Sequence, residues 1–207
     1  MSALEVRTCS VGPWPMNAYA LVCPTQRVSA LIDPGAEPER LLTLLADTTP
    51  SCIILTHTHA DHIGALAALR AHLGVPLLAH AAPHHNSMHL AVDRTLATGD
   101  EVALGDGRLR VYAAPGHCVD QICLRDLGGQ SVIVGDTIFA GGPGRTWSPE
   151  DFQITLHTLR NVVLPWPDET HCYPGHGPSF HLGTIRTQVA AFCEREHPPG
   201  FCGHAAW

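Results

Sequence analysis

A short polar cluster directly after an apolar segment constrains this chain more than any other feature. Residues 56–62 read Thr-His-Thr-His-Ala-Asp-His and follow the apolar run Cys-Ile-Ile-Leu at 52–55. Neutral imidazoles and carboxylates are nitrogen and oxygen ligands that zinc, iron and manganese accept. Even in a chain with 15 histidines, four such side chains within this one heptapeptide are hard to attribute to chance. The cluster therefore predicts a metal site formed by His57, His59, Asp61 and His62.

The spacing within the cluster divides its ligands into two pairs. An apolar run such as residues 52–55 is typical of a buried strand, and residues two apart on an extended chain point the same way. His57 and His59 can therefore share one metal ion. Asp61 and His62 follow where the chain turns and leave that turn in a different direction. This arrangement suits a second metal ion beside the first.

A helix is expected directly after the cluster. Apolar residues recur at roughly helical spacing over residues 63–73, and Gly74 and Pro76 form a stop signal. Asp61 then lies near the N-terminus of this helix. In an alternative interpretation, Asp61 only caps the helix and the histidines are surface residues.

Three further ligand-type residues occur downstream, each at the end of a strand-like segment: His117, Asp136 and His176. Five imidazoles and two carboxylates together are enough to fill two sites. The residue types and their spacing make a two-metal centre the working hypothesis.

Several short motifs carry a family resemblance. In chain order they are Ile-Asp-Pro-Gly at 32–35, the His-x-His-x-Asp-His cluster, Pro-Gly-His at 115–117, Gly-Asp-Thr at 135–137 and Gly-His-Gly-Pro at 175–178. The set resembles the ordered motifs of the metallo-β-lactamase-fold hydrolases. Within that superfamily the chain is most similar to short glyoxalase II-like (hydroxyacylglutathione hydrolase-like) proteins, with supporting matches at 12–19 and 144–146. The cluster is specific to the superfamily and less specific to a substrate.

The resemblance implies a role for each ligand. The first metal ion would be held by His57, His59 and His117. The second would be held by Asp61, His62 and His176, and Asp136 would bridge both. Asp61 and Asp136 are expected to be catalytic as well. Asp33 resembles a motif aspartate that orients the site by hydrogen bonding, although an ordinary turn aspartate before Pro-Gly fits the same local sequence.

The expected chemistry follows from charge. Two dications facing two carboxylates and one hydroxide leave a formal charge of roughly plus one, which suits an anion that develops during reaction. A water between metals about 3.5–4 Å apart would have its pKa lowered from roughly 15.7 towards 7, and the resulting hydroxide would attack a carbonyl carbon. A thiolate leaving group suits zinc, which favours a thioester substrate. The expected cofactors are two divalent metal ions, zinc first, with iron or manganese as alternatives.

Composition and charge limit the class of protein. The chain has 207 residues, 45% of them hydrophobic and 15% charged, so a single domain over residues 1–207 with a sizeable core is expected. No apolar run approaches the roughly 20 residues of a membrane span and the N-terminus lacks a signal-peptide pattern, which predicts a cytoplasmic protein without a membrane partner. A net charge of −7 with only 12 Lys and Arg argues against nucleic acid as a ligand. The expected partner is a small-molecule substrate, and no pattern predicts an oligomeric state.

Strand-like and helical patterns alternate along the chain, which favours α/β layers. Strands are expected at 4–9, 19–23, 28–32, 52–55, 77–80, 109–113, 122–124, 131–134 and 171–173. Helices are expected at 38–47, 63–73, 149–164 and 184–196. The resemblance sharpens this class to a four-layer αββα sandwich, with two sheets face to face, helices outside and the metals at one open edge.

The remaining cysteines and histidines have weaker patterns. The eight cysteines include no Cys-x-x-Cys pair, and we expect buried reduced thiols, with a disulfide framework as the alternative. Cys118 adjoins His117; packing is its expected role and metal ligation the alternative. A second histidine group could pass for a metal cluster, although ordinary solvated side chains are favoured for its members, His80, His84, His85 and His89.

Substrate recognition is expected in the glycine-rich segment 141–147, because binding groups often lie on loops held by a scaffold. Arg145 could pair with a substrate carboxylate, with Trp147 beside it. A structural salt bridge for Arg145 and a core-covering role for Trp147 are the alternatives. Glyoxalase II enzymes carry a C-terminal helical region that helps bind glutathione, whereas 207 − 176 = 31 residues follow His176 here, so recognition of glutathione is left open.

Other functions on the same site stay open. An iron persulfide dioxygenase shares the fold and several ligands, but such enzymes resemble Gly-Arg-Thr-Asp-Phe where this chain has Trp147 after Thr146. A lactonase would use the same hydroxide on a cyclic ester. A true β-lactamase is a further alternative, but the predicted role of Asp136 as a ligand that bridges both metal ions fits a thioesterase better. A purely metal-dependent binding module is disfavoured because no ligand position is missing, and a flavodiiron oxidase is set aside because position 59 is histidine rather than glutamate.

Overall fold

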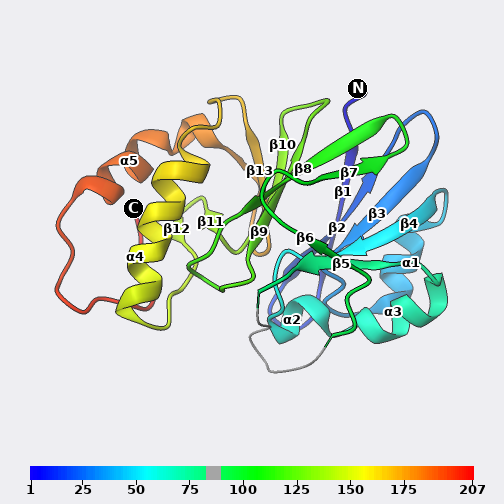
Figure 1. The fold of residues 1–207 in the computed structure, drawn as a ribbon, viewed down its shortest axis with the longest axis horizontal. Coiled ribbons are helices and arrows are strands. Elements are labelled where there is room, and N and C mark those ends of the chain that lie inside the picture. Colours follow the sequence, from blue (N-terminus) through cyan, green and yellow to red (C-terminus); the bar gives the residue numbers. More distant parts are fainter. Residues whose placement is uncertain (83–89) are drawn as a thin grey trace.

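Two six-stranded sheets form the body of the protein in the computed structural model, which describes residues 1–82 and 90–207 (Figure 1). The first sheet contains, in spatial order, β1 (Glu5–Val11), β2 (Met16–Val22), β3 (Val28–Ile32), β4 (Thr49–Ile54), β5 (Leu77–His80) and β6 (Arg94–Leu96). The second contains β14 (Phe180–His181), β13 (His171–Pro174), β10 (Ser131–Gly135), β9 (Ile122–Asp126), β8 (Gly107–Ala113) and β7 (Glu101–Leu104). A separate hairpin pairs β11 (Ile138–Phe139) with β12 (Gly142–Pro143).

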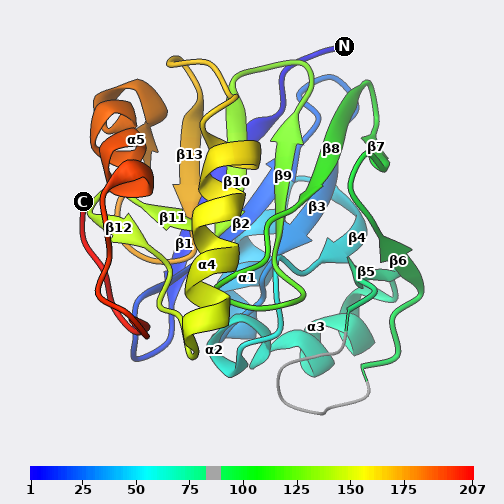
Figure 2. The same ribbon diagram turned by 60° about the vertical axis from the view of Figure 1, so that its left-hand side comes forward.

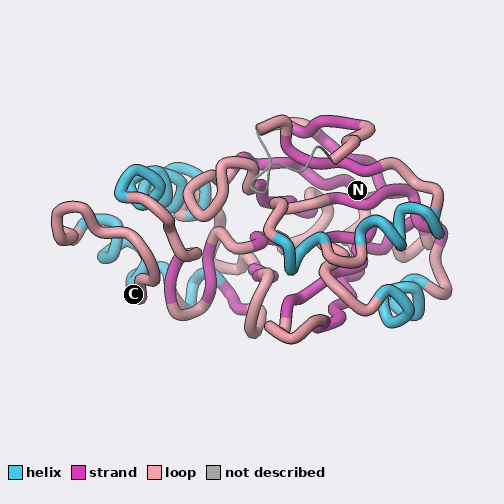
Figure 3. The backbone as a smooth tube through the Cα atoms, turned by 90° about the horizontal axis from the view of Figure 1, so that it is seen from below, coloured by secondary structure: helices cyan, strands magenta, loops and turns pink. Residues whose placement is uncertain are grey.

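Helices cover the outer face of each sheet. The first half of the chain provides α1 (Pro38–Leu45), α2 (Ala60–Ile63) and α3 (Leu66–Leu73). The second half provides α4 (Pro149–Thr158), which continues as a π-helical turn at Leu159–Val163, and α5 (Arg186–Glu194), which follows a 3-10 turn at Leu182–Thr184. Figure 1 shows α4 and α5 to the left of most strands and α1 and α3 to the right, and Figure 3 shows helical segments toward the same two ends in a view from below. Figure 2 shows α4 and α5 beside the strands of the second sheet. Among the described residues, no helix is both long and apolar enough to cross a bilayer.

Alternating side chains along the strands build three apolar cores. In β3, Ala30 and Ile32 belong to the core between the sheets, whereas Leu31 packs with the helices of the first half. This alternation follows from the two-residue repeat of a strand. On the other side, Phe152 and Phe192 pack helices α4 and α5 onto the second sheet. Burial of each large apolar side chain contributes about 1.5–3 kcal/mol to the stability of the fold. The three cores are separate sets of such contacts, and together they hold the four layers of the αββα sandwich in place.

Helix α4 begins where the sequence predicts. Ser148 caps it by accepting a hydrogen bond from the backbone N–H of Asp151 at 3.1 Å, and Pro149 occupies the first turn. A serine cap satisfies a backbone donor that the helix leaves free, and proline loses no hydrogen bond at that position.

The predicted helix over residues 63–73 is wrong in one respect, because two helices replace it. The helix is interrupted between α2 and α3, where the backbone N–H of Ala65 donates to the carbonyl of Pro34 at 2.9 Å. A Cβ on Gly64 would lie 2.4 Å from the carbonyl oxygen of Gly35, so the two backbones are in contact there. This tertiary contact takes the place of continued helix. The short strands β6, β7, β11, β12 and β14 were also not predicted.

Hydrogen bonds between the sheets join the loops at one edge of the sandwich. The backbone N–H of Ile122, at the start of β9, donates to the carbonyl of Thr56, two residues after β4, at 2.8 Å. The N–H of Asn17 donates to the carbonyl of Gly175, directly after β13, at 2.7 Å. The segments after β4 and β13 are therefore fixed relative to each other. The predicted metal ligands lie at this edge, on loops or, for Asp61 and His62, in the short helix α2.

Candidate metal centre

The three histidines predicted for the first metal ion point at one another. Nδ1 of His59 lies 3.0 Å from Nε2 of His57 and 2.8 Å from Nε2 of His117. His57 and His59 come from the segment after β4, and His117 comes from the loop between β8 and β9. Three imidazole nitrogens this close form a ready set of ligands for a metal ion such as zinc.

Cys118 lies beside this trio without completing it. Its sulfur is within 4.8 Å of ligand atoms of His57, His59 and His117. However, the sulfur is 3.3 Å from Nε2 of His59 and 3.7 Å from Nδ1, so it lies nearer the nitrogen that faces away from the trio. This geometry fits the packing role predicted for Cys118 better than a ligand role.

The residues predicted for the second metal ion also converge. Asp61, His62 and His176 place one ligand atom each within 4.8 Å of the others. Oδ2 of Asp61 lies 3.2 Å from Nε2 of His176, although more than a hundred residues separate them in the chain. Asp61 does not cap the helix, because His59 occupies the cap position of α2 and makes no side-chain capping bond there. The alternative in which Asp61 is only a helix cap is therefore wrong.

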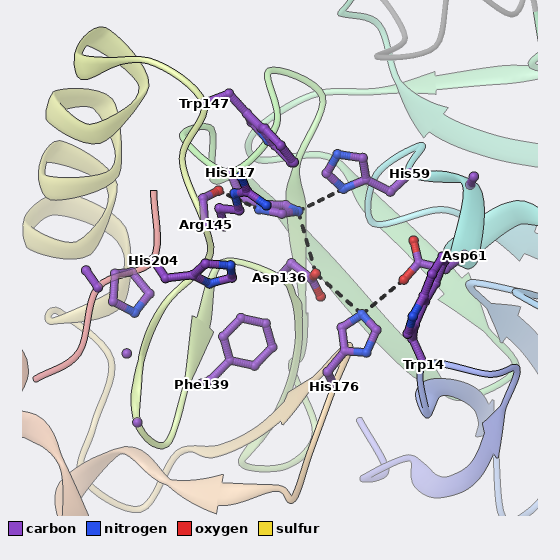
Figure 4. A pocket seen from close by; sticks show the side chains of 15 residues that line it. Trp14, His59, Asp61, His117, Asp136, Phe139, Arg145, Trp147, His176 and His204 are labelled. Carbon is purple, nitrogen blue, oxygen red and sulfur yellow. Dashed lines mark hydrogen bonds and ion pairs between the residues drawn. The ribbon is translucent and has the colours of Figure 1, made fainter. Parts of the chain in front are cut away.

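Asp136 lies between the two sets. Its Oδ2 is 3.5 Å from Nε2 of His117 and 3.7 Å from Nε2 of His176 (Figure 4). Its Oδ1 is 3.6 Å from Nε2 of His62. One carboxylate thus faces a member of the first set and two members of the second. This is the position expected of a bridging ligand.

Outward hydrogen bonds fix the orientation of four imidazoles. Nδ1 of His117 donates to the carbonyl of Arg145 at 2.8 Å, and Nδ1 of His176 contacts the carbonyl of Pro15 at 3.3 Å. Nδ1 of His62 lies 3.0 Å from a carboxylate oxygen of Asp33. A carbonyl or carboxylate oxygen can only accept, so each Nδ1 carries the proton.

His57 follows the same rule through a relay. Thr56 donates its hydroxyl proton to Asp33 at 2.6 Å, and the hydroxyl oxygen is 3.1 Å from Nδ1 of His57, which must then donate. In all four rings Nε2 is left facing the centre, as is typical of metal-binding histidines with a hydrogen-bonded outer nitrogen. Asp33 also accepts from the backbone N–H of Thr56 at 2.7 Å, so its carboxylate orients the site and is more than a turn residue.

Two buried polar atoms show that the centre fits a bound cation. Nε2 of His62 and Oδ1 of Asp136 have no hydrogen-bond partner among the described residues, although both are buried. They face each other across 3.6 Å, which is too long for a hydrogen bond. Buried polar groups are costly when unpaired, and a metal ion between such groups would satisfy both.

Burial and charge set the protonation of the imidazoles. Burial, together with neighbouring histidines, holds the pKa of His57 well below its usual value and lowers the pKa of His117 to about 3. Burial alone would lower the pKa of His62, but the hydrogen bond to Asp33 and nearby carboxylates outweigh it and raise the pKa to about 9. The hydrogen bond to Asp61 raises the pKa of His176. His57 and His117 are therefore neutral and ready to bind, whereas a cation at the second set must displace protons.

The side chains of the centre are too buried to be ordinary surface histidines. His57, His62 and His117 are 1%, 0% and 8% exposed.

The predictions for the other cysteines and histidines have different outcomes. All eight cysteines are free, which excludes the disulfide alternative for this fold. His84, His85 and His89 lie outside the described residues, so the second histidine group stays a prediction.

A cavity of about 880 Å³ opens above the centre (Figure 4). Both predicted substrate residues, Arg145 and Trp147, line it, and the Arg145 guanidinium carbon stacks 4.3 Å from the centre of the Trp147 ring. Arg145 forms no ion pair with any described side chain, which is against the structural salt bridge. Trp147 is 49% exposed and so does not serve mainly to cover the core.

Sequence reasoning missed several residues of the cavity wall: Trp14, Phe139, His204 and Ala205. Trp14 stands between two prolines in a conspicuous motif, which was a signal that could have been used. His204 has no partner pattern in the sequence, and only the folded chain brings it to the cavity.

Comparison with known sequences identifies the family. The sequence matches the family model of the Metallo-beta-lactamase superfamily over residues 11–179, and the chain belongs to that superfamily. It is 32% identical over 204 residues to the probable metallo-hydrolase YqgX of Bacillus subtilis, covering 89% of this chain and 96% of that protein. It is 33% identical over 172 residues to the hydroxyacylglutathione hydrolase of Polaromonas sp., covering 79% of this chain and 64% of that enzyme.

Solved structures agree with this assignment. The crystal structure of the BLEG-1 B3 metallo-beta-lactamase superposes with a TM-score of 0.79 at 27% identity, covering 88% of this chain and 97% of that one. TTHA1623 in a di-iron-bound form superposes with a TM-score of 0.76 at 32% identity, covering 86% and 96%. The predicted family and fold class are therefore confirmed. The family and the relatives support a hydrolase, and the cluster of histidines and aspartates supports divalent metal ions.

Proposed function

We propose that this protein is a binuclear metal-dependent thioesterase of the glyoxalase II type. The position of Asp136, within 3.7 Å of imidazoles from both ligand sets, is the observation that carries the proposal. A relative named as a hydroxyacylglutathione hydrolase supports a thioester substrate. The expected metal ligands remain those predicted from the sequence: His57, His59, Asp61, His62, His117, Asp136 and His176.

The protein's own groups perform the positioning in this mechanism. When bound, two divalent cations would supply an activated water as nucleophile and polarise the substrate carbonyl. Asp61 and Asp136 would supply the negative charge that holds these cations. The outward hydrogen bonds of His62 and His117 keep the inner nitrogens in place, so little reorganisation accompanies the reaction.

Arg145 would bind a carboxylate of the substrate. Its guanidinium is charged at all ordinary pH values and can pair with a carboxylate through two hydrogen bonds. Among the residues that line the cavity, Arg145 is the one side chain with a permanent positive charge. The stacking on Trp147 holds the cation at the cavity wall.

Zinc is the proposed metal, since a thiolate leaving group suits it. The di-iron-bound form of TTHA1623 is a specific reason to keep iron and the persulfide dioxygenase as the second candidate. A lactonase would use the same metal centre, but its cavity would accept a cyclic ester in place of a thioester. Small-molecule chemistry and a cytoplasmic location stay predictions, as does the absence of a nucleic-acid or membrane partner.

Metal analysis combined with a substrate panel tests the proposal. The purified protein is analysed for zinc, iron and manganese and then assayed with S-lactoylglutathione, a persulfide, an acyl-homoserine lactone and a β-lactam. We expect thioester hydrolysis, and we expect His59→Ala or Asp136→Ala to lose both bound metal and turnover. Full activity in either variant, or oxygen-dependent turnover of the persulfide alone, would overturn it.

A further inference from the structure

Three aromatic side chains surround the metal centre, each beside a different ligand. The ring of Trp147 lies 6.1 Å from that of His59, and the ring of Phe139 lies 6.5 Å from that of His176. Figure 4 shows Trp14 beside Asp61, across the cavity from Trp147. A substrate bound at the centre would therefore lie close to three aromatic rings.

Trp14 is held firmly although most of it is exposed. The prolines on both sides of it restrict the backbone, and the N–H of Gly12 donates to Glu37 at 2.9 Å. The carbonyl of Pro15 is the acceptor for Nδ1 of His176, so the loop that carries Trp14 is bonded to a predicted metal ligand. Trp14 is nevertheless 70% exposed. The packing of the fold does not account for an ordered tryptophan that leaves this much surface in water, and such residues are typical of binding sites.

The last residues of the chain close the opposite wall. The backbones of Thr146 and Gly203 exchange two hydrogen bonds, of 3.1 and 3.0 Å, and the N–H of Trp207 donates to the carbonyl of Gly141 at 3.2 Å. A Cβ on Gly142 would lie 2.2 Å from the carbonyl oxygen of Ala205, so glycine is required where the two segments touch. His204 and Ala205 are thereby fixed on the cavity wall.

The chemistry of this wall is mainly apolar. Beyond the predicted metal ligands, the lining side chains are three aromatic rings, Ala60, Pro143, Ala205, the imidazole of His204 and the single guanidinium of Arg145. A flat apolar group would contact the rings directly, and aromatic rings favour such contacts beyond the burial of area alone.

We propose that this pocket selects substrates with an aryl group next to the scissile thioester bond, with Trp14, Phe139 and Trp147 as the specificity-determining residues. The inference rests on the proposed function. In the reaction, water adds to the carbonyl carbon, the carbon–sulfur bond breaks, and a carboxylic acid and a thiol are released. The aryl group is carried by either the acyl part or the thiol part, and both place the same chemistry between the rings.

A matched thioester panel tests the inference on the metal-loaded protein. N-acetylcysteamine thioesters of acetate, lactate and phenylacetate vary the acyl part, and S-benzyl thioacetate varies the thiol part. We expect kcat/KM for at least one aryl substrate to exceed that for the acetyl thioester by about tenfold or more. Trp14→Ala should lower kcat/KM for the aryl substrate more than for the acetyl thioester and so remove most of this preference, and Trp14→Phe should restore it.

The controls separate this inference from the proposed function. Ile154→Ala removes another exposed apolar side chain, which lies on α4 and outside this cavity. This variant should leave kcat/KM unchanged for both the aryl and the acetyl substrate. Equal kcat/KM for aryl and acetyl substrates, or an equal loss for both in Trp14→Ala, would overturn the inference and leave the thioesterase intact. If no thioester is hydrolysed, the aryl preference is tested by measuring the binding of phenylacetate and of acetate to the protein by calorimetry. Tighter binding of phenylacetate that is lost in Trp14→Ala supports the aryl pocket, and equal binding overturns it.

Discussion

Nδ1 of His62 lies 3.0 Å from Oδ2 of Asp33, and neither side chain is more than 1% exposed. The same carboxylate accepts from the hydroxyl of Thr56, which in turn accepts from His57. One buried aspartate, placed directly after β3, thus orients a histidine of each predicted ligand set. Groups that orient metal ligands commonly affect metal affinity by 10- to 100-fold.

Asp33→Asn should therefore weaken metal binding by about 10- to 100-fold, because the amide keeps the shape but loses the charge that holds the His62 proton. Chelator competition on the purified variant measures the change. Asp126→Asn is the matched control, since Asp126 is also a buried carboxylate and accepts from the backbone N–H groups of Leu4 and Gly128 at 2.9 Å, away from the site. Metal affinity that is unchanged in Asp33→Asn would show that Asp33 has no orienting role.

Metal uptake should depend on pH in a defined direction. In the metal-free protein His62 has a pKa raised to about 9, so it holds a proton throughout the neutral range. A cation must displace this proton, and affinity should rise about tenfold per pH unit for each proton displaced, up to a pH of about 9. Calorimetry in buffers of different ionisation enthalpy counts the released protons. Constant affinity between about pH 6.5 and 8.5 would contradict the assignment of His62 as a ligand.

Gly175 should tolerate no side chain. A Cβ there would lie 2.2 Å from Oδ1 of Asp136 and 2.6 Å from Cε1 of His62. Gly175→Ala must displace at least one of these groups, so we expect loss of metal at the second set and loss of turnover. Gly141→Ala, where a Cβ meets nothing within 4 Å, is the control and should retain its metal content. Elemental analysis of both variants reads the result.

Arg145→Met should raise the KM for thioesters that carry a carboxylate by about tenfold and have little effect on uncharged ones. The reason is that no other side chain of the cavity wall has a permanent positive charge. Steady-state kinetics on a charged and an uncharged thioester measures the difference. Arg94→Met, at an exposed arginine of the first sheet, should change neither KM. An equal rise for both substrates would show that Arg145 only supports the loop.

The seven proposed ligands can be predicted from the sequence because their local sequence context marks them. Four of them are nearly contiguous, and the others follow apolar segments that only a strand explains. Many strand positions were also readable, since central strands such as β2, β3 and β10 are buried on both faces and their residues are strongly apolar. The break between α2 and α3 was not readable, because a tertiary hydrogen bond from Ala65 to Pro34 causes it.

The cavity wall shows where sequence reasoning ends. Trp14, Phe139 and His204 come from a hairpin loop, a two-residue strand and the last residues of the chain. No periodicity links them, and their convergence depends on backbone bonds between segments far apart in sequence, such as those of Thr146 with Gly203. The hydrogen bond between His62 and Asp33 agrees with the orienting role that the family resemblance implies for Asp33. The bonds of His117 and His176 to backbone carbonyls have no signal in the sequence.

The most direct test of the two-metal centre is the metal stoichiometry of the purified protein, followed together with thioester turnover as metal is added back to the stripped protein. We predict that about two divalent ions bind per chain and that turnover requires both, with Asp136→Ala unable to reach that stoichiometry. Full turnover with a single bound ion, or a saturated protein that binds one ion or none, would contradict the account.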